Sequence, residues 1–275
     1  MAIPNALPAD APAGGPATVL RPPLKWAGGK RWQVPHLRPL WESHRHRRLV
    51  EPFCGGLAVT LGLMPERALL ADVNPHLVNF YRWLQRGLEV NLPLDNNSKL
   101  YYAYRDRFNG LLTAGAGESA EAAILFYYLN RTGYNGLCRF NSKGAFNVPF
   151  GRYKNIEYKT DFHEYQALLS RFAFVHADFE QLAVEPEDFI YADPPYDVPF
   201  TQYSQGGFGW PEQERAAGWV AKHCGPVVLV NQATDRINAL YRDLGFKLDY
   251  WPAPRLISCT GDRTPVIEVI ATLNV

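Results

Sequence analysis

The chain has 275 residues, of which 47% are hydrophobic and 20% are charged. This length and composition exclude a disordered chain and favour one large domain, or one domain with a sizeable insertion. The formal net charge is +1, so the total charge alone gives no indication for or against a polyanionic partner. No apolar run approaches the roughly 20 residues that a membrane-spanning helix needs, so we expect no membrane partner.

The N-terminal segment, residues 1–20, is rich in Ala, Pro and Gly and is predicted to be a disordered tail. It lacks the charged start and the continuous apolar run of a signal peptide. The four cysteines of the whole chain lie far apart and form no CxxC pair, so the sequence predicts neither a metal site nor a disulfide framework. We therefore expect a reducing, cytoplasmic environment. The cysteines are Cys54, Cys138, Cys224 and Cys259.

Taken in chain order, five near-continuous apolar segments separated by helical stretches predict an α/β fold with a doubly wound, mostly parallel sheet. Pro75 follows the second segment, and proline suits the first turn of a helix. Two later strands, 246–251 and 265–273, have no helix-length link and should form an antiparallel hairpin, which brings the sheet to seven strands. The five earlier strands are expected within residues 48–56, 67–75, 172–179, 188–196 and 226–231.

Residues 91–160 interrupt this alternation of strands and helices. Segments 100–112 and 118–133 are predicted helices, and Ser119 is a suitable N-cap for the second. The Asn-Ser-Lys-Gly turn within residues 136–150 predicts a β-hairpin. We expect this block to be an insertion between the second and third strands of the sheet, flanked by two segments of one domain, residues 21–90 and 161–275.

Ligands of an open parallel sheet bind beyond the carboxyl ends of the strands. This rule places Phe53–Gly56, Asp72, Asp178 and Asp193 along one edge. Gly55 lets a ligand approach the backbone closely, and Asp72 could bind both hydroxyls of a ribose, although Gly and Asp also end many strands without any function. The GxGxxG fingerprint is absent, so we favour a nucleoside cofactor without phosphates, such as S-adenosylmethionine.

The segment LKWAGGKRW, residues 24–32, adds Lys25, Trp26 and Lys30 to the candidate residues. It has two glycines and a lysine but lacks the spacing of a phosphate-binding P-loop. By itself it is better explained as the start of a helix with solvated lysines.

The stretch FIYADPPY delivers Asp193 to the same edge, followed by Pro194, Pro195 and Tyr196. An exocyclic aromatic amine is a poor nucleophile because its lone pair is delocalised into the ring. The carboxylate of Asp193 and the carbonyl of Pro194 could accept both N–H groups of such an amine, and Tyr196 could stack on a flat base. The alternative is an ordinary Asp-Pro-Pro turn after a strand.

The chain resembles the Dam-type DNA adenine-N6 methyltransferases, a family that uses S-adenosylmethionine. The matching stretches are LKWAGGK, VEPFCGG, ADVNP, YYLNRTGYNGLCRFNSKGAFNVPFGRY and YADPPY, and they follow the family's order from residue 24 to about residue 273. The long middle stretch is the most specific, since DPPY also occurs in other amino methyltransferases. The resemblance implies a cofactor pocket lined by Trp26, Lys30, Phe53, Asp72, Asp178, Phe179 and Asp193.

Two departures from the family pattern affect these expectations. Leu57 stands where the family often has Gly, so the cofactor loop is expected to differ locally. The stretch after Tyr196 matches poorly apart from FTQY, and its Gly206, Gly207 and Gly209 suggest a mobile loop that closes over the base.

Basic residues are concentrated in two acid-free stretches, 21–38 and 131–154, and aromatic residues alternate with them in the second. A basic hairpin can enter a DNA major groove, where Arg binds guanine, although an ordinary solvated face has the same composition. By resemblance, Asn135 or Tyr134 would fill the gap left by a flipped adenine of GATC, and Arg152 would hold phosphate. Base edges would be read by Lys25, Leu137, Arg139, Pro149 and Tyr153.

Other interpretations remain open. The acceptor could be cytosine N4, RNA or a protein glutamine, although the hairpin block favours double-stranded DNA. A DNA-binding protein without catalysis is a further alternative, against which the intact Asp193–Tyr196 and Asp72 argue. Cys54 is expected to be structural because exocyclic amines need no covalent intermediate. The basic run 44–48 is expected to be a solvated loop at the opposite edge of the sheet, and no obligate protein partner is evident.

Overall fold

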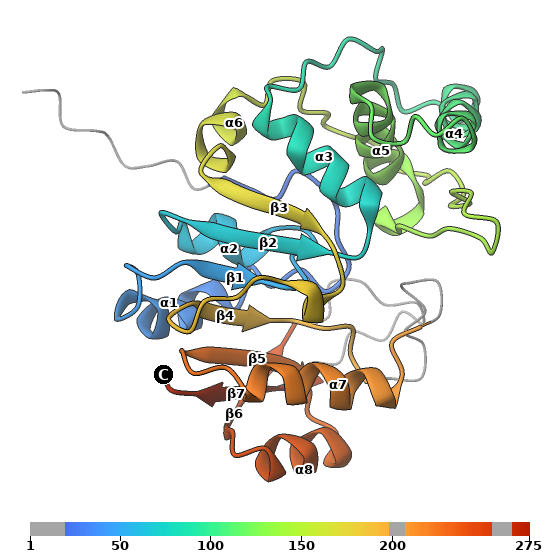
Figure 1. The fold of residues 1–275 in the computed structure, drawn as a ribbon. Helices are drawn as coiled ribbons and strands as arrows, with labels where there is room; N and C mark the ends of the chain where they lie inside the picture. Colours follow the sequence, from blue (N-terminus) through green and yellow to red (C-terminus); the bar gives the residue numbers. More distant parts are fainter. Residues whose placement is uncertain (1–19, 198–206, 255–265) are drawn as a thin grey trace, which may run out of the picture.

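The computed structural model describes residues 20–197, 207–254 and 266–275. They form one seven-stranded sheet in the order β3-β2-β1-β4-β5-β7-β6 (Figure 1). The strands are β1 (Leu49–Glu51), β2 (Ala68–Asp72), β3 (Phe172–His176), β4 (Phe189–Ala192), β5 (Val227–Gln232), β6 (Lys247–Ala253) and β7 (Val266–Leu273).

Strands β1 to β5 pair in parallel, whereas β7 is antiparallel to both β5 and β6. The predicted doubly wound, mostly parallel α/β sheet of seven strands is therefore confirmed. The antiparallel pairing of the last two strands is also confirmed, and β7 lies between β5 and β6 in the sheet.

The central strands are buried on both faces, so alternate residues of β4 face two different cores. Phe189 and Tyr191 lie in the core that also holds side chains of α1 (Val34–Glu42), α2 (Ala58–Leu63), α3 (Pro75–Gln85) and α6 (His163–Leu169). Ile190 and Ala192 lie in the core formed with α7 (Trp210–Ala221) and α8 (Asp235–Asp243). Because helices cover both faces of these strands, a ligand of the central strands is expected at their ends.

The start of α3 shows how local sequence sets an element beside the sheet edge. Asn74 is its N-cap, and the side chain accepts hydrogen bonds from the backbone N–H groups of His76 and Leu77. Pro75 occupies the first helical position, as predicted from its place after the second strand.

Residues 91–160 contribute helices α4 (Ser98–Thr113) and α5 (Ala120–Thr132), followed by a short 3-10 turn, η1 (Tyr134–Gly136). Ser119 caps α5 as predicted, accepting the N–H of Ala122 at 3.2 Å. Helix α5 packs between α3 and α4, as Figure 1 shows beyond the β3 edge of the sheet. Because Tyr127 stacks on Phe80 of α3 with parallel rings, the inserted helices share the core of the sheet.

The hairpin expected within residues 136–150 is present in a short form that contains no regular strand. In residues 133–153, which we call the 133–153 loop, isolated antiparallel bridges join Gly133 to Phe150 and Phe140 to Phe146. Backbone hydrogen bonds flank the second bridge and close the predicted Asn-Ser-Lys-Gly turn. On the side that faces away from Phe140, the backbone N–H and C=O of Phe146 both bond to the side chain of Asn109 on α4. A side chain of the neighbouring helix thus takes the position that a further strand would have.

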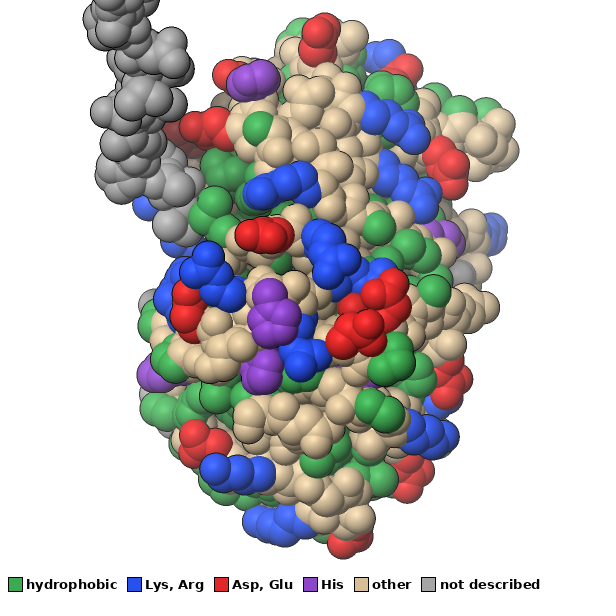
Figure 2. Space-filling view, turned by 60° about the vertical axis from the view of Figure 1, so that its left-hand side comes forward, with side chains coloured by type: hydrophobic (Ala, Val, Ile, Leu, Met, Phe, Trp, Pro, Cys, Tyr) green, Lys and Arg blue, Asp and Glu red, His purple; other side chains and the backbone are tan. Residues whose placement is uncertain are grey.

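The basic run at residues 44–48 lies between α1 and the start of β1, opposite to the carboxyl ends of the strands. Arg48 binds Asp188 with two contacts of 2.6 and 2.9 Å, and Arg45 pairs with Glu42 at 3.1 Å. Figure 2 brings this side of the molecule forward, and acidic, basic and histidine side chains are mixed on it. The run forms a surface loop as expected, although Arg48 is fixed in an ion pair.

Within the described ranges, no helix is both long and apolar enough to cross a bilayer, and no cluster of three or more potential metal ligands occurs.

Candidate active site

The carboxyl ends of β2, β1 and β4 meet at one edge of the sheet because these strands pair in parallel register. Asp72 ends β2, Phe53 follows β1, and Asp193 follows β4. The edge predicted from the sequence therefore brings these three residues together.

Asp193 lies at the boundary between this edge and the buried interior. Its side chain is 21% exposed, whereas the side chains of Lys30 and Glu268 behind it are each 6% exposed. The Nζ atom of Lys30 is 3.2 Å from Oδ1 of Asp193 and donates to the carbonyl oxygen of Gly28 at 2.8 Å. Burial raises the pKa of Asp193 to about 6, and the nearby Lys30 charge opposes this rise.

The backbone after Asp193 is held by two buried amides from other elements. Gln213 of α7 donates to the carbonyl of Pro195 at 2.7 Å, and Asn231 of β5 accepts the N–H of Asp197 at 3.2 Å. Asn231 also donates to Gln213 at 2.9 Å, which fixes both amides. No donor from the described residues bonds to the carbonyl of Pro194, so this acceptor stays available beside Asp193.

Tyr196 completes this DPPY loop, which we define as Asp193–Tyr196. The Nζ atom of Lys30 lies 4.5 Å from the centroid of its ring. Lys30 thus contacts both the carboxylate at the start of the loop and the aromatic ring at its end, so one buried cation links the two.

The turn after β1 is pressed against the segment that carries Trp26. Gly55 has φ +42°, and a Cβ atom there would lie 2.7 Å from Nε1 of Trp26. A Cβ at Gly56 would lie 2.8 Å from the Cβ of Trp26. Only glycine permits this approach, which brings Trp26 to the strand ends.

Asp72 is tied to the same turn. Its carboxylate accepts the N–H of Gly55 at 3.2 Å and the N–H of Asn74 at 2.9 Å. Burial raises the pKa of Asp72 to about 6, and the two backbone donors oppose this rise. The oxygens retain lone pairs for further donors, such as sugar hydroxyls.

Leu57, which stands where the family often has Gly, keeps the backbone conformation that glycine favours. It has φ 59° and ψ 26°, in the left-handed region, and its side chain is buried. The local difference expected in this loop therefore consists of a buried leucine side chain and of backbone strain at the N-cap of α2.

An aromatic pair and a charged cluster border the β1 and β3 ends. The rings of Phe53 and Phe179 are 5.4 Å apart. Asp178 is held by Arg215 of α7 in two contacts of 2.7 and 2.8 Å, and this partner lowers the pKa of Asp178. The guanidinium of Arg215 also lies 4.2 Å from the centroid of Phe179. Asp178 is therefore already engaged by a cation that the sequence did not indicate.

The 133–153 loop approaches the N-terminal segment through Lys25. The backbone of Lys25 exchanges two hydrogen bonds of 2.8 Å with the side chain of Asn130, which also donates to the carbonyl of Gly136 at 3.2 Å. The Nζ atom of Lys25 lies 3.4 Å from the centroid of the Tyr153 ring and donates to the carbonyl of Arg131. Burial and the charge of Arg131 lower the pKa of Lys25 to about 8.

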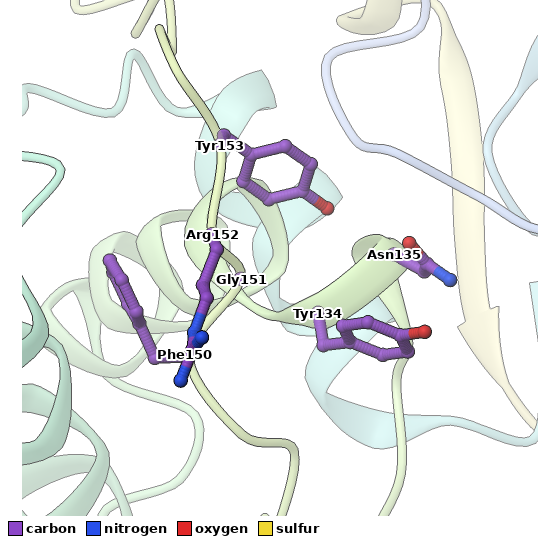
Figure 3. Close-up of a pocket in the computed structure, with 6 residues that line it drawn as sticks. All are labelled: Tyr134, Asn135, Phe150, Gly151, Arg152 and Tyr153. Atoms are coloured by element: carbon purple, nitrogen blue, oxygen red, sulfur yellow. The ribbon is translucent and has the colours of Figure 1, made fainter.

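A cavity of about 250 Å³ opens within the 133–153 loop (Figure 3). Tyr134 and Arg152 are exposed. Asn135 has φ 53°, which is unusual for a residue other than glycine, and this backbone conformation sets the direction of its side chain. The residues that line the cavity are Tyr134, Asn135, Phe150, Gly151, Arg152 and Tyr153.

The remaining predicted residues of this loop lie on its outer part. Arg139 is exposed, and its guanidinium is held by Asn147 through a side-chain contact of 2.8 Å and a backbone contact of 3.2 Å. Pro149 is exposed and Leu137 is half-buried. These residues are therefore accessible to a partner.

Comparison with known proteins decides the family. The family model for D12 class N6 adenine-specific DNA methyltransferases matches residues 26–255. The chain belongs to this family. It is 37% identical to a DNA adenine methylase of Vibrio cholerae, covering 90% of this chain and 94% of that protein. It is 33% identical to the retron Ec67 DNA adenine methylase of Escherichia coli, with 90% of each covered. It is 32% identical to a type II methyltransferase of Lactococcus lactis, covering 92% of this chain and 95% of that one.

The family assigns the activity of this D12 class methyltransferase as N6-adenine methylation of DNA. This assignment favours DNA adenine over the alternatives of an RNA or protein acceptor and of cytosine N4. Cys54 is buried, and burial raises the pKa of its thiol well above its usual value, which disfavours the thiolate form that a nucleophile needs. The loop expected to close over the base lies largely outside the described residues, as does Cys259.

Several polar residues of this methyltransferase site escaped sequence reasoning. Glu268 and Asn231 are buried polar residues in largely apolar strands, and Asn130 is one in a largely buried helix. A polar residue next to an apolar run was the available signal, because a buried polar group needs a partner. Gln33, Gln213 and Arg215 gave no comparable signal.

Proposed function

We propose that this methyltransferase transfers the methyl group of S-adenosylmethionine to the N6 amine of an adenine flipped out of duplex DNA, within the sequence GATC. The main observation in support of methyl transfer to an amine is the pair of hydrogen-bond acceptors at the end of β4. Asp193 offers a partly exposed carboxylate, and the adjacent Pro194 carbonyl has no donor among the described residues.

The two acceptors suit the electronic problem of the substrate. The N6 lone pair is delocalised into the purine ring, and hydrogen bonds from both N–H groups to Asp193 and Pro194 favour its localisation on nitrogen. A carboxylate held in a low-dielectric site makes such a bond strong and needs little reorganisation. Tyr196 provides an aromatic face on which the base can stack.

The cofactor would lie along the same edge. Asp72 would accept ribose hydroxyls, while Trp26, Phe53 and Phe179 would supply apolar walls, and Gly55 would allow close approach to the backbone. Lys30 and Asp178 border this space. The polar and aromatic groups fit a nucleoside with a charged amino-acid tail, and no glycine-rich phosphate cradle is required. When bound, S-adenosylmethionine supplies an electrophilic methyl group.

The DNA would meet residues 91–160 through the 133–153 loop. Arg139, Leu137, Pro149, Lys25 and Tyr153 would contact base edges. Arg139 is the residue best suited to bind guanine with two hydrogen bonds, because its exposed guanidinium is released by breaking only surface contacts with Asn147. Asn135 or Tyr134 would enter the gap left by the extruded adenine, and Arg152 would bind phosphate.

The test uses methyl-labelled S-adenosylmethionine with GATC duplexes and scrambled duplexes of equal composition. Digestion and mass spectrometry should find the label on N6 of the GATC adenine. Label spread equally over scrambled duplexes would reject the GATC specificity alone. Absence of transfer to every duplex, with S-adenosylmethionine still bound, would reject the proposed donor and substrate together.

A further inference from the structure

A continuous series of buried polar side chains lies directly behind Asp193. Tyr191 donates to Oε1 of Gln33 at 2.7 Å, and Nε2 of Gln33 donates to Oε2 of Glu268 at 2.6 Å. The other oxygen of Glu268 is 3.8 Å from Nζ of Lys30, which is 3.2 Å from Asp193. The series starts and ends on the β4 segment and joins it to the N-cap of α1 and to β7.

Stability alone does not account for this arrangement. Gln33 is fully buried, and Lys30 and Glu268 are each 5% exposed as residues. A buried ion pair adds little net stability compared with apolar side chains of similar size. What distinguishes this cluster is its position, since Lys30 touches the carboxylate that faces the acceptor amine.

We propose that Glu268 is a positioning residue for methyl transfer. Together with Gln33 it holds Lys30 behind Asp193, and so fixes the orientation and the charge of the acceptor carboxylate. Glu268 itself does not reach the substrate. The inference rests on the role proposed above for Asp193 and adds a residue on β7, on the other side of β5 from β4 in the sheet.

Among the described residues, two groups carry the charges that act on Asp193. Lys30 lowers the pKa of Asp193 and Glu268 raises it. The other ionisable groups near it are neutral at pH 7, because burial raises the pKa of Glu51 to about 8 and raises those of the nearby tyrosines. The tyrosines are Tyr191 of β4, Tyr196 of the DPPY loop and Tyr241 of α8.

Because the charges of Lys30 and Glu268 act oppositely on the pKa of Asp193, their removal should shift the pH profile of the transfer rate in opposite directions. Ionised Asp193 is the active form, so the transfer rate falls as the pH falls through its pKa. Glu268→Gln removes the charge that raises this pKa and should move the acid limb of the rate profile to lower pH. Lys30→Gln removes the charge that lowers it and should move the limb to higher pH. Both variants should lose about 10- to 100-fold of the maximal rate, since Asp193 is no longer held in place.

The experiment is a pH profile of the single-turnover rate at saturating DNA and cofactor, so that product release does not mask the chemical step. Asp188→Asn is the matched control: Asp188 is also a buried carboxylate with a cationic partner, Arg48, but it lies at the opposite end of β4. This control should be less stable, with the acid limb unmoved.

An unchanged limb and an unchanged maximal rate in Glu268→Gln would overturn the inference. If that variant does not fold, Gln33→Met removes the hydrogen bonds of Gln33 with Glu268 and Tyr191 while it keeps every charge. This variant should lower the maximal rate without moving the acid limb of the pH profile. A wild-type rate in Gln33→Met would likewise overturn it. Asp193→Asn separates the two proposals: its inactivity leaves the proposed function standing whatever Glu268 does, and its full activity would reject the proposed function itself.

Discussion

The DPPY loop and the 133–153 loop are supported in opposite ways. The DPPY loop follows a central strand, and residues from α7, β5 and the segment before α1 hold it through buried contacts. The 133–153 loop follows a helix, has two isolated bridges, and keeps its outer side chains exposed. The loop proposed to carry out the chemistry is thus fixed by the sheet, whereas the surface proposed to read DNA can be altered with little effect on the core.

The largest effect is expected for Asp193→Asn. The change keeps the size of the side chain but replaces an acceptor carboxylate with an amide, so methyl transfer should fall by about 100-fold or more. Affinity for GATC duplex should change by less than tenfold, because the 133–153 loop is untouched. Rapid-quench transfer rates and a DNA-binding titration would check this. A parallel loss of rate and affinity would show that the two regions are not separable.

Asn130→Ala should have the next largest effect. Asn130 joins the backbone of Lys25 to that of Gly136, and its removal leaves buried backbone groups unpaired at about 1–3 kcal/mol each. We expect a less stable enzyme that distinguishes GATC from scrambled duplex at least tenfold less well. Chemical denaturation and competition binding would measure the two quantities. Unaltered discrimination in a folded variant would contradict the linking role of Asn130.

The pH dependence of cofactor affinity should be moderate. Because burial raises the pKa of Asp72 to about 6, the carboxyl becomes protonated as the pH falls through that value and accepts ribose hydroxyls less well. The Kd for S-adenosylmethionine should rise by up to about tenfold per pH unit below 6. Calorimetric titration of wild type and Asp72→Asn would test it, since the variant should lose the pH dependence between pH 5 and 7.

The smallest effect concerns Leu57. Glycine usually destabilises a protein relative to alanine, but Leu57 has φ 59°, where a Cβ atom costs about 1–2 kcal/mol. Leu57→Gly should therefore be more stable than Leu57→Ala by about 1 kcal/mol, although both lose the buried leucine side chain. Urea unfolding of the Leu57→Gly and Leu57→Ala variants measures this difference. A more stable alanine variant would contradict the prediction and would show that the turn relaxes.

The strands could be predicted because apolar runs ending at acids or turn residues carry their signal locally. The same rule placed Asp72 and Asp193 at one edge. The turn of the hairpin within residues 136–150 could be predicted from Asn-Ser-Lys-Gly. Its contact with the inserted helices could not, because Phe146 bonds to the side chain of Asn109, which lies on a helix well before it in the sequence. Tertiary contacts of this kind leave no mark in the periodicity of the loop itself.

The residues that hold the DPPY loop could not be predicted from the sequence for a related reason. The motif identifies Asp193, but Gln213, Asn231 and Glu268 come from three later elements and meet it only in the folded chain. Asp178 was expected at the cofactor edge and lies there, yet its engagement by Arg215 depends on where α7 packs. A motif thus identifies the proposed reacting groups better than it identifies the residues that hold them.

The separation of chemistry from recognition is tested most directly by one paired measurement. Single-turnover transfer and DNA affinity are determined on GATC and scrambled duplexes, at fixed salt, for Asp193→Asn, Arg139→Ala and Lys143→Ala. Lys143 is the control because it is an exposed cation in the turn of the same loop and is not among the residues proposed to read bases. Asp193→Asn should lose transfer while keeping the affinity ratio between the duplexes, and Arg139→Ala should lower that ratio at least tenfold. Lys143→Ala should weaken both affinities equally. An affinity ratio that survives in Arg139→Ala, or falls in Asp193→Asn, would contradict the account.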